Sequence, residues 1–279
     1  MRWRNRRQSG NVEDRRGSGS GRIAVGGIGT IVIAIIIWLL GGNPLEFIES
    51  GNVSNTEIES AEIPENDTLA QYVAVVLAET EDVWDSIFSA SGERYRQPKL
   101  VLFRNTIQSA CGYASDASGP FYCPGDEKVY IDLGFFDEMQ TRFGATGDFA
   151  FAYVIAHEIG HHVQKQLGVL EKAQEMKSGK SEKEANKVQV KVELQADFYA
   201  GIWAYHIAKY KKIIEDGDAE EALNAANAVG DDRLQRQYQG TVVPDAFTHG
   251  TSRQRMEWFM RGFKTGNIEL GNTFENESL

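Results

Sequence analysis

The chain has 279 residues, of which 42% are hydrophobic and 25% charged, and its formal net charge is −11. This balance is typical of a globular protein and excludes disorder of the whole chain. The charge is uneven, because seven arginines against two acidic residues give residues 1–22 a net charge of +5 and leave −16 for the remainder. A body this acidic argues against nucleic acid as a partner, since phosphate binding needs a basic surface.

Residues 23–40 form an uncharged apolar run. As a helix they would extend about 27 Å, close to the thickness of the hydrocarbon core of a membrane. Arginines precede the run and none follows it directly, so the positive-inside rule predicts a cytoplasmic basic tail at 1–22 and the rest of the chain outside. The alternative is a cleaved signal peptide, whose apolar core is usually about 7–15 residues long. We predict a single uncleaved transmembrane helix, followed by a polar linker at 41–66 and one domain at 67–279.

The only two cysteines are Cys111 and Cys123. The segment between them is rich in turn-forming residues, and a disulfide is permitted if the body is exported. Closing so short a loop would stabilise the fold by about 3 kcal/mol in the entropic account. Two free thiols in a reducing compartment are the alternative. The predicted topology favours the disulfide.

The secondary-structure pattern beyond the linker predicts a mainly helical α+β domain with a small sheet. Asp67 is a candidate N-cap for the first helix. The next strong helix has Asp148 as its expected N-cap and Gly168 at its end, and residues 168–181 are expected to be a loop. Periodicity and turn signals predict these elements: helices at 68–90, 135–143, 149–167 and 182–210, strands at 99–103 and 129–133, and a further helix around Trp258 and Phe259.

Inside the 149–167 helix, His157 and His161 are four residues apart and project from one face. That spacing lets two imidazoles bind one tetrahedral zinc ion. Glu158 is adjacent and can accept a proton from a water that zinc has made more acidic. The pattern is the H-E-x-x-H motif of zinc metallopeptidases, with His157 and His161 as ligands and Glu158 as the catalytic base.

A catalytic zinc site needs a third protein ligand and one open position. Glu193, on the predicted 182–210 helix, is the best candidate. Asp197 lies one turn further on the same face and is expected to accept a hydrogen bond from a ligand histidine. The alternative for both is an exposed acidic helix face. Small residues nearby, including Ala196 and Ala200, would let the two helices approach closely.

Three other histidines have weaker assignments. His162 points about 100° away from His161, and His206 lies on the far side of its helix from Glu193, so both are expected to pack structurally. His249 precedes the helix around Trp258. It is a candidate donor to the oxyanion of the reaction, and capping or packing of that helix is the alternative.

Several segments together resemble the bacterial family named "putative neutral zinc metallopeptidase". They are His157-Glu-Ile-Gly-His-His162, Glu193-Leu-Gln-Ala-Asp197, Gly119-Pro-Phe-Tyr-Cys-Pro124 and His249-Gly-Thr-Ser-Arg-Gln-Arg255. The resemblance extends from the arginine-rich start to Phe263. It implies a zincin-like metallopeptidase with His157, His161 and Glu193 as ligands and Glu158 as the catalytic residue, and it names no substrate.

The sequence therefore predicts a membrane-anchored peptidase with one zinc ion per chain, acting on peptide or protein substrates outside the cytoplasm. Strand 129–133 is a candidate for pairing with an extended substrate. One alternative is a non-catalytic membrane-tethered binding module with a structural zinc. Another is an assembly subunit whose zinc site is vestigial.

Overall fold

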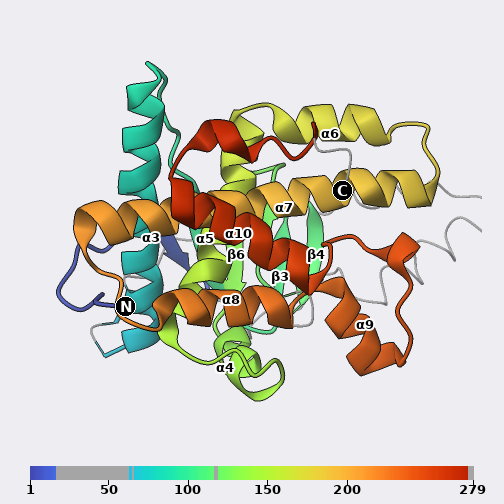
Figure 1. The fold of residues 1–279 in the computed structure, drawn as a ribbon. Helices are drawn as coiled ribbons and strands as arrows, with labels where there is room; N and C mark the ends of the chain where they lie inside the picture. The colour runs from blue at the N-terminus through green and yellow to red at the C-terminus, as the bar shows by residue number, and fades with distance from the viewer. Residues whose placement is uncertain (17–62, 65, 116–118, 276–279) are drawn as a thin grey trace, which may run out of the picture.

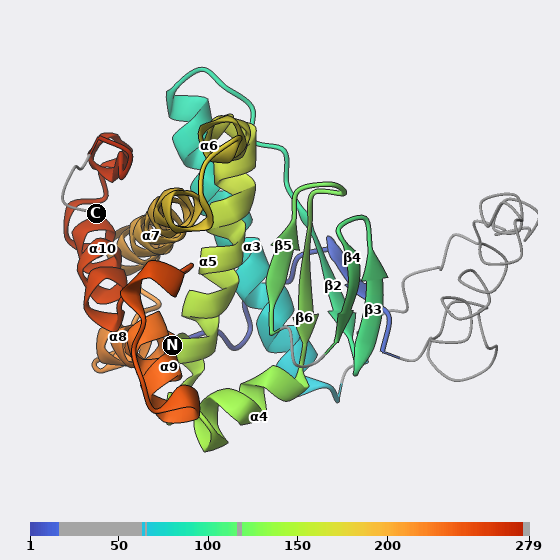
Figure 2. The same cartoon turned by 90° about the vertical axis from the view of Figure 1, so that its right-hand side faces the viewer.

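The computed structural model describes residues 1–16, 63–64, 66–115 and 119–275. Figure 1 shows the helices and strands in the colours of the chain, and Figure 2 shows the sheet beside the helices. The strands are β1 (Val12–Asp14), β2 (Lys99–Phe103), β3 (Thr106–Ser109), β4 (Gly112–Ser115), β5 (Phe121–Cys123) and β6 (Lys128–Asp132). The helices are α3 (Thr68–Ala90), α4 (Gly134–Thr141), α5 (Asp148–Gln166), α6 (Val169–Lys177), α7 (Glu182–His206), α8 (Asp218–Ala228), α9 (Asp231–Gln239) and α10 (Ser252–Thr265).

The main sheet is mixed, with strand order β1-β2-β6-β5. β1, β2 and β6 run parallel, and β5 is antiparallel to β6. Successive side chains of a strand point to opposite faces of the sheet. In β2, Leu100 and Leu102 join the large core with the helices, whereas Val101 and Phe103 join a smaller cluster on the opposite face. Both faces of β2 are therefore covered.

The smaller cluster lies under the β3–β4 hairpin, whose Ile107 packs against it. A disulfide between Cys111 and Cys123 ties the turn of this hairpin to the end of strand β5. The predicted disulfide is thereby confirmed in the structure. It anchors the strand that precedes Pro124, next to the candidate site described below.

Helix α5 lies between the sheet and the outer helices α7 and α10 (Figure 2). Its contact with α7 is close because Gly160 has no side chain: a Cβ there would come within 2.9 Å of the carbonyl oxygen of Ala196. Glycines also bring α7 and α10 together, since a Cβ on Gly201 would meet the Phe259 carbonyl oxygen at 2.1 Å. Small residues thus set the spacing of the three helices that carry the site.

The first 16 residues differ from the prediction of a separate basic tail. They belong to the same folded body as the residues from 66 onward, because β1 pairs with β2 over three residue pairs. The side chain of Met1 is buried, and Trp3 packs edge-on against Tyr72. The predicted transmembrane helix at 23–40 lies outside the described residues. Within the described part of the chain, no helix is long and apolar enough to cross a membrane.

The mainly helical α+β class is confirmed, and most predicted elements occur within a few residues of their expected bounds. The prediction of a loop at 168–181 was wrong, because Val169–Lys177 forms α6. Its single buried residue, Ala173, packs against Val188 and Val192 of α7, and so short an apolar stripe carries little periodic signal. Asp148 does not cap α5 either. The cap position is Gly147, and Asp148 is the first helical residue.

Strand β6, which corresponds to the predicted 129–133 strand and begins and ends one residue earlier, is an interior strand. Both its edges are taken, by β2 on one side and by β5 on the other. It therefore cannot pair with a substrate as expected. Among the described strands, β5 is the outer neighbour of β6 at that end of the sheet.

Candidate active site

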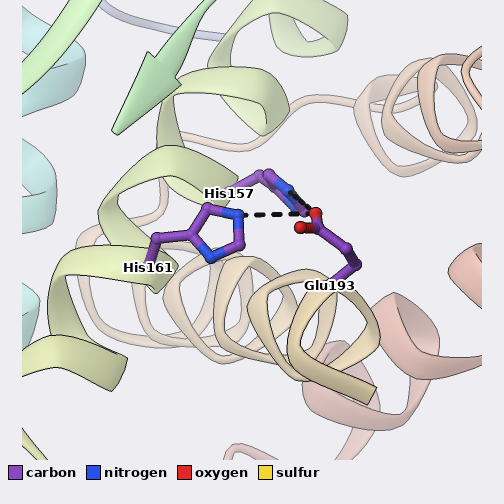
Figure 3. Close-up of side chains that lie close together, drawn as sticks. All are labelled: His157, His161 and Glu193. Carbon is purple, nitrogen blue, oxygen red and sulfur yellow. Dashed lines mark hydrogen bonds and ion pairs between the residues drawn. The ribbon is translucent and has the colours of Figure 1, made fainter. Parts of the chain in front are cut away.

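Helix α5 presents His157 and His161 toward α7, from which Glu193 points back at them (Figure 3). The Nε2 atom of His157 is 3.2 Å from Oε2 of Glu193, and Nε2 of His161 is 3.4 Å from the same oxygen. One ligand atom from each residue lies within 4.8 Å of the others. The structure thus brings together the three residues that the sequence predicts as zinc ligands.

The opposite nitrogen of each histidine is already engaged. His157 Nδ1 is 2.8 Å from Asp197 Oδ1, an ionised oxygen that can only accept, so this nitrogen donates. His161 Nδ1 is 2.9 Å from Oε1 of Gln164, whose amide nitrogen donates to the Val192 carbonyl. The Nε2 atoms of His157 and His161 can therefore act as electron-pair donors, and both face the carboxylate of Glu193.

Three electron-pair donors that face one another at this distance suit a cation. A tetrahedral zinc ion with bonds of about 2.0–2.1 Å holds neighbouring ligand atoms about 3.3 Å apart. The two nitrogen-to-oxygen distances, 3.2 and 3.4 Å, agree with that spacing. Without a metal, burial lowers the pKa of His157, but the charge of Asp197 and hydrogen bonds to Asp197 and Glu193 outweigh burial and raise this pKa to about 9. His157 is then protonated, and its proton takes the position between His157 and Glu193 where a metal would bind.

Behind the ligands, Asp197 is completely buried and is the centre of a polar network. Arg255 of α10 donates to both its oxygens, at 2.8 and 2.9 Å, and the hydroxyl of Tyr153 donates to Oδ1 at 2.5 Å. Burial raises the pKa of Asp197, but the charges of Arg255 and His157 lower it to about 2. Asp197 therefore stays ionised and holds His157 by its Nδ1.

Sequence reasoning missed Arg255, although a signal existed. Arg255 shares one face of α10 with Trp258, Phe259 and Gly262, all of them buried. An arginine within an apolar helix face requires a buried acceptor, because an unpaired buried charge is costly. That acceptor is Asp197.

Glu158 lies beside the three ligands and is only 8% exposed. Burial raises the pKa of its carboxyl group, with the charges of His157 and His161 acting in the opposite direction. A carboxylate with a raised pKa is a stronger base than an exposed one, which suits it to accept a proton near neutral pH.

His249 reaches the same cleft from the loop before α10, and its side chain is half exposed. Its Nδ1 lies 3.2 Å from Oδ1 of Asp231, the first residue of α9. Oδ2 of Asp231 accepts hydrogen bonds from the backbone N–H groups of Thr248, His249 and Gly250. These bonds fix the loop before α10. Burial lowers the pKa of His249, but Asp231 and the charge of Glu193 raise it overall. Asp231 was also missed by sequence reasoning, because its partner lies 18 residues away.

The candidate site opens into two adjacent hollows that meet at His161 and Glu193. One hollow has a volume of about 390 Å³ and the other about 430 Å³, and they share Tyr122, His161 and Glu193. The first contains Glu158 and His249 and has apolar walls formed by Phe121, Phe135, Val154, Val229 and Leu234. The second is lined largely by α6 and α7, including Leu170, Lys177 and Val192, together with Lys165 of α5.

The two remaining histidines lie outside the ligand cluster. His162 is 1% exposed, and its ring nitrogens contact the hydroxyl of Tyr122 and the carbonyl oxygen of Arg96. Burial lowers the pKa of His162, with the Arg96 carbonyl acting against it. His206 packs between the rings of Tyr205 and Tyr210. Both therefore have packing contacts of the kind expected from sequence.

Comparison with known proteins places this geometry in a family. The profile of the family described as "Putative neutral zinc metallopeptidase" matches residues 1–274. The chain belongs to this family. A member from Escherichia coli K12, named "Uncharacterized protein YpfJ", is 47% identical over 284 residues, which cover 98% of this chain and 99% of that protein.

A second relative is the Mycobacterium tuberculosis H37Rv protein named "Uncharacterized protein Rv2575". It is 40% identical over 219 residues, covering 75% of this chain and 73% of that protein. No solved structure matches the chain. Family membership therefore supports zinc and peptidase chemistry, and the residue roles depend on the geometry above.

Proposed function

We propose that this protein is a zinc-dependent peptidase of the zincin type, with His157, His161 and Glu193 as the metal ligands. The observation that carries the proposal is the convergence of two histidine Nε2 atoms on one Glu193 oxygen, beside a buried Glu158 and open to a cleft. A zinc ion held there supplies a Lewis acid that activates water and polarises a peptide carbonyl group.

The protein's own groups then move the protons. Glu158 accepts a proton from the attacking water and returns it to the leaving amine. His249, turned into the cleft and held by Asp231, donates a hydrogen bond to the oxygen that becomes negative during the reaction. Arg255 and Asp197 keep His157 in position behind the site.

The shape of the cleft favours cleavage within a chain over removal of a terminal residue. Two adjacent hollows that meet at His161 and Glu193 provide space for a peptide that continues past the scissile bond in each direction. Residues Phe121 and Tyr122 of β5 line the first hollow. This strand, at the edge of the described sheet, offers its backbone to an extended peptide.

A structural zinc site in a non-catalytic binding module is the alternative. Such a site closes around its metal with four protein ligands. Here three candidate ligands come together, and they face a cleft that also contains Glu158 and His249. A vestigial site in an assembly subunit would not need these two groups. The arrangement therefore favours catalysis.

The decisive experiment is Glu158→Gln, which keeps the size of the side chain and removes the base. We expect the variant to retain one zinc per chain while cleavage of casein or a peptide library falls by about 10²–10⁴-fold. Zinc content and cleavage rate are measured on the same preparation. Equal cleavage by wild type and Glu158→Gln would refute the mechanism, and loss of zinc would show that Glu158 is a ligand.

A second variant tests the role of His249. We expect His249→Gln to retain zinc and to lower kcat by about 10²–10³-fold with little change in KM, as loss of an oxyanion donor does. His206→Gln is the control, because His206 packs against tyrosines away from the cleft. If His249→Gln lost zinc instead, His249 would be a ligand; an unchanged kcat would assign it to packing.

We further propose that the catalytic body works outside the cytoplasm, attached to the membrane through residues 23–40. The Cys111–Cys123 disulfide supports an oxidising compartment. Peptide or protein substrates and the membrane are the partners in this proposal.

A further inference from the structure

The N-terminal 16 residues are joined to the body along their length by backbone hydrogen bonds. Arg2 N–H donates to the carbonyl of Ile213 at 2.8 Å, and Ser9 N–H donates to that of Ala74 at 2.9 Å. Further on, Arg15 N–H donates to the carbonyl of Leu102 at 2.8 Å, continuing the pairing of β1 with β2. The pairing of β1 with β2 extends the main sheet by a strand and covers the edge of β2.

Charged side chains of this segment pair with carboxylates of the body. Arg6 donates to Glu79 at 2.6 Å, and Arg7 donates to Glu81 at 2.9 Å. With the segment in place, these two glutamates are 3% and 1% exposed. Glu13 of β1 makes the reverse contact, accepting from Lys128 at 2.9 Å. Arginines of the segment thus pair with glutamates of the body, and a glutamate of the segment pairs with a lysine of the body.

The start of the segment reaches the helix that carries the zinc ligands. The ammonium group of Met1 lies 3.0 Å from carboxylate oxygens of both Asp148 and Asp218. Asp148 is the first residue of α5. Trp3 packs against Tyr72, whose hydroxyl donates to the backbone carbonyl of Asp148 at 2.5 Å. The segment therefore supports the N-terminal end of α5.

These contacts conflict with a single membrane crossing between the segment and the body. The hydrocarbon core of a bilayer is about 30 Å thick, and groups on opposite sides cannot form hydrogen bonds of 3 Å. We propose that residues 1–16 and the catalytic body lie on the same side of the membrane, docked as in this structure.

The arginines, which suggested a cytoplasmic tail, have a different use in this arrangement. The positive-inside rule counts arginines that remain in a short loop beside the membrane. Five of those in residues 1–16 instead form ion pairs: Arg2, Arg6, Arg7, Arg15 and Arg16. The sixth, Arg4, lies over the ring of Trp3. Four of these arginines, Arg2, Arg6, Arg7 and Arg16, bind carboxylates of the body, whereas Arg15 pairs with Glu13 of the segment itself.

Labelling of single cysteines in the full chain tests the proposal. Gln8→Cys marks the segment and Lys264→Cys marks the body, and both positions are exposed. Bacterial spheroplasts that express each variant are treated with a membrane-impermeant maleimide, before and after permeabilisation. We expect the two cysteines to behave alike, both labelled or both protected before permeabilisation. Labelling of one cysteine while the other requires permeabilisation would overturn the proposal. A cytosolic thiol protein is the control for intact membranes.

Cross-linking in membranes tests docking itself. The side-chain amides of Asn11 and Gln97 lie 3.1 Å apart, one on the segment and one on the body. In the Asn11→Cys/Gln97→Cys variant, a short bis-maleimide should join the two within one chain. Asn11→Cys paired with Lys264→Cys is the matched control, which should not be linked. Absence of a link, with both cysteines reactive singly, would show that the segment does not dock in the membrane-bound protein.

Discussion

At the scale of single residues, Arg255 shows how the candidate site depends on a buried charge that acts on His157 through Asp197. It is 4% exposed, binds Asp197 with two nitrogens and also donates to the hydroxyl of Tyr153. The guanidinium group is planar and stays charged, so it can fix a carboxylate through two parallel hydrogen bonds. Through Asp197 it fixes the ring of His157.

We expect Arg255→Gln to weaken zinc binding by about 10–100-fold, because Asp197 would then hold His157 less firmly. Chelator competition measures the affinity. Arg253→Gln is the matched control on the same helix, since Arg253 is exposed and pairs with the exposed Glu257. Zinc affinity that is unchanged in Arg255→Gln would show that Arg255 contributes only to packing.

The residues that bind zinc in our proposal could be predicted from sequence, and so could Asp197, which accepts a hydrogen bond from His157, but Asp231 and Arg255 could not. The i, i+4 spacing of His157 and His161 is local and places both on one helix face whatever the fold. Asp231 and Arg255 act on residues 18 and 58 positions away. Their roles follow only once α9 and α10 have packed against the earlier helices.

At the scale of elements, the approach of α5 to α7 determines whether the ligands can meet. Gly160 lies between His157 and His161 in the sequence. It faces Ala196, which lies between Glu193 and Asp197 on α7. A side chain at Gly160 would contact the Ala196 carbonyl oxygen at 2.9 Å and its Cα at 3.1 Å. Because these are backbone atoms of Ala196, a Cβ at position 160 can be accommodated only if one of the two helices shifts.

We therefore expect Gly160→Ala to lower the free energy of unfolding by about 1–3 kcal/mol, as overpacking does. It should also weaken zinc binding, because it moves His157 and His161 away from Glu193. Denaturant unfolding and zinc titration provide the two measurements. Gly10→Ala is the control, since a Cβ there meets nothing within 4 Å. If Gly160→Ala bound zinc normally, the spacing of the helices would not limit the site.

Helices with a long periodic pattern were predicted well, as were the five-residue strands β2 and β6, whereas α6 and β1 were not predicted. The α5 and α7 patterns extend over many turns, so their type was clear. Helix α6 has nine residues with one buried alanine, and β1 has three residues whose pairing with β2 depends on a distant segment. Tertiary contacts, rather than local propensity, decide such elements.

At the scale of the whole molecule, the placement of residues 1–16 was the largest difference from the sequence prediction. An arginine-rich stretch before an apolar run has the composition of a cytoplasmic flank. Composition does not show that Glu79 and Glu81 are positioned to bind those arginines. The structure makes the segment part of the body that holds the site.

At the same scale, a bound metal should stabilise the whole fold. The candidate ligands come from α5 and α7, so a bound zinc ion would join the two central helices. A metal that binds only the folded state raises the free energy of unfolding by about 2.7 kcal/mol when its free concentration is 100 times Kd. We expect a chelator to lower the Tm of the wild-type protein.

Two variants make this measurement specific. In Glu193→Gln, which lacks the ligand from α7, the chelator should have little effect on Tm, because little metal is bound. In Glu158→Gln, which keeps all three ligands, the effect of the chelator should equal that in wild type. Calorimetry with metal analysis before and after chelation distinguishes the cases. If wild type lost one zinc per chain without a change in Tm, the metal would lie outside the α5–α7 contact, and the ligand assignment would be wrong.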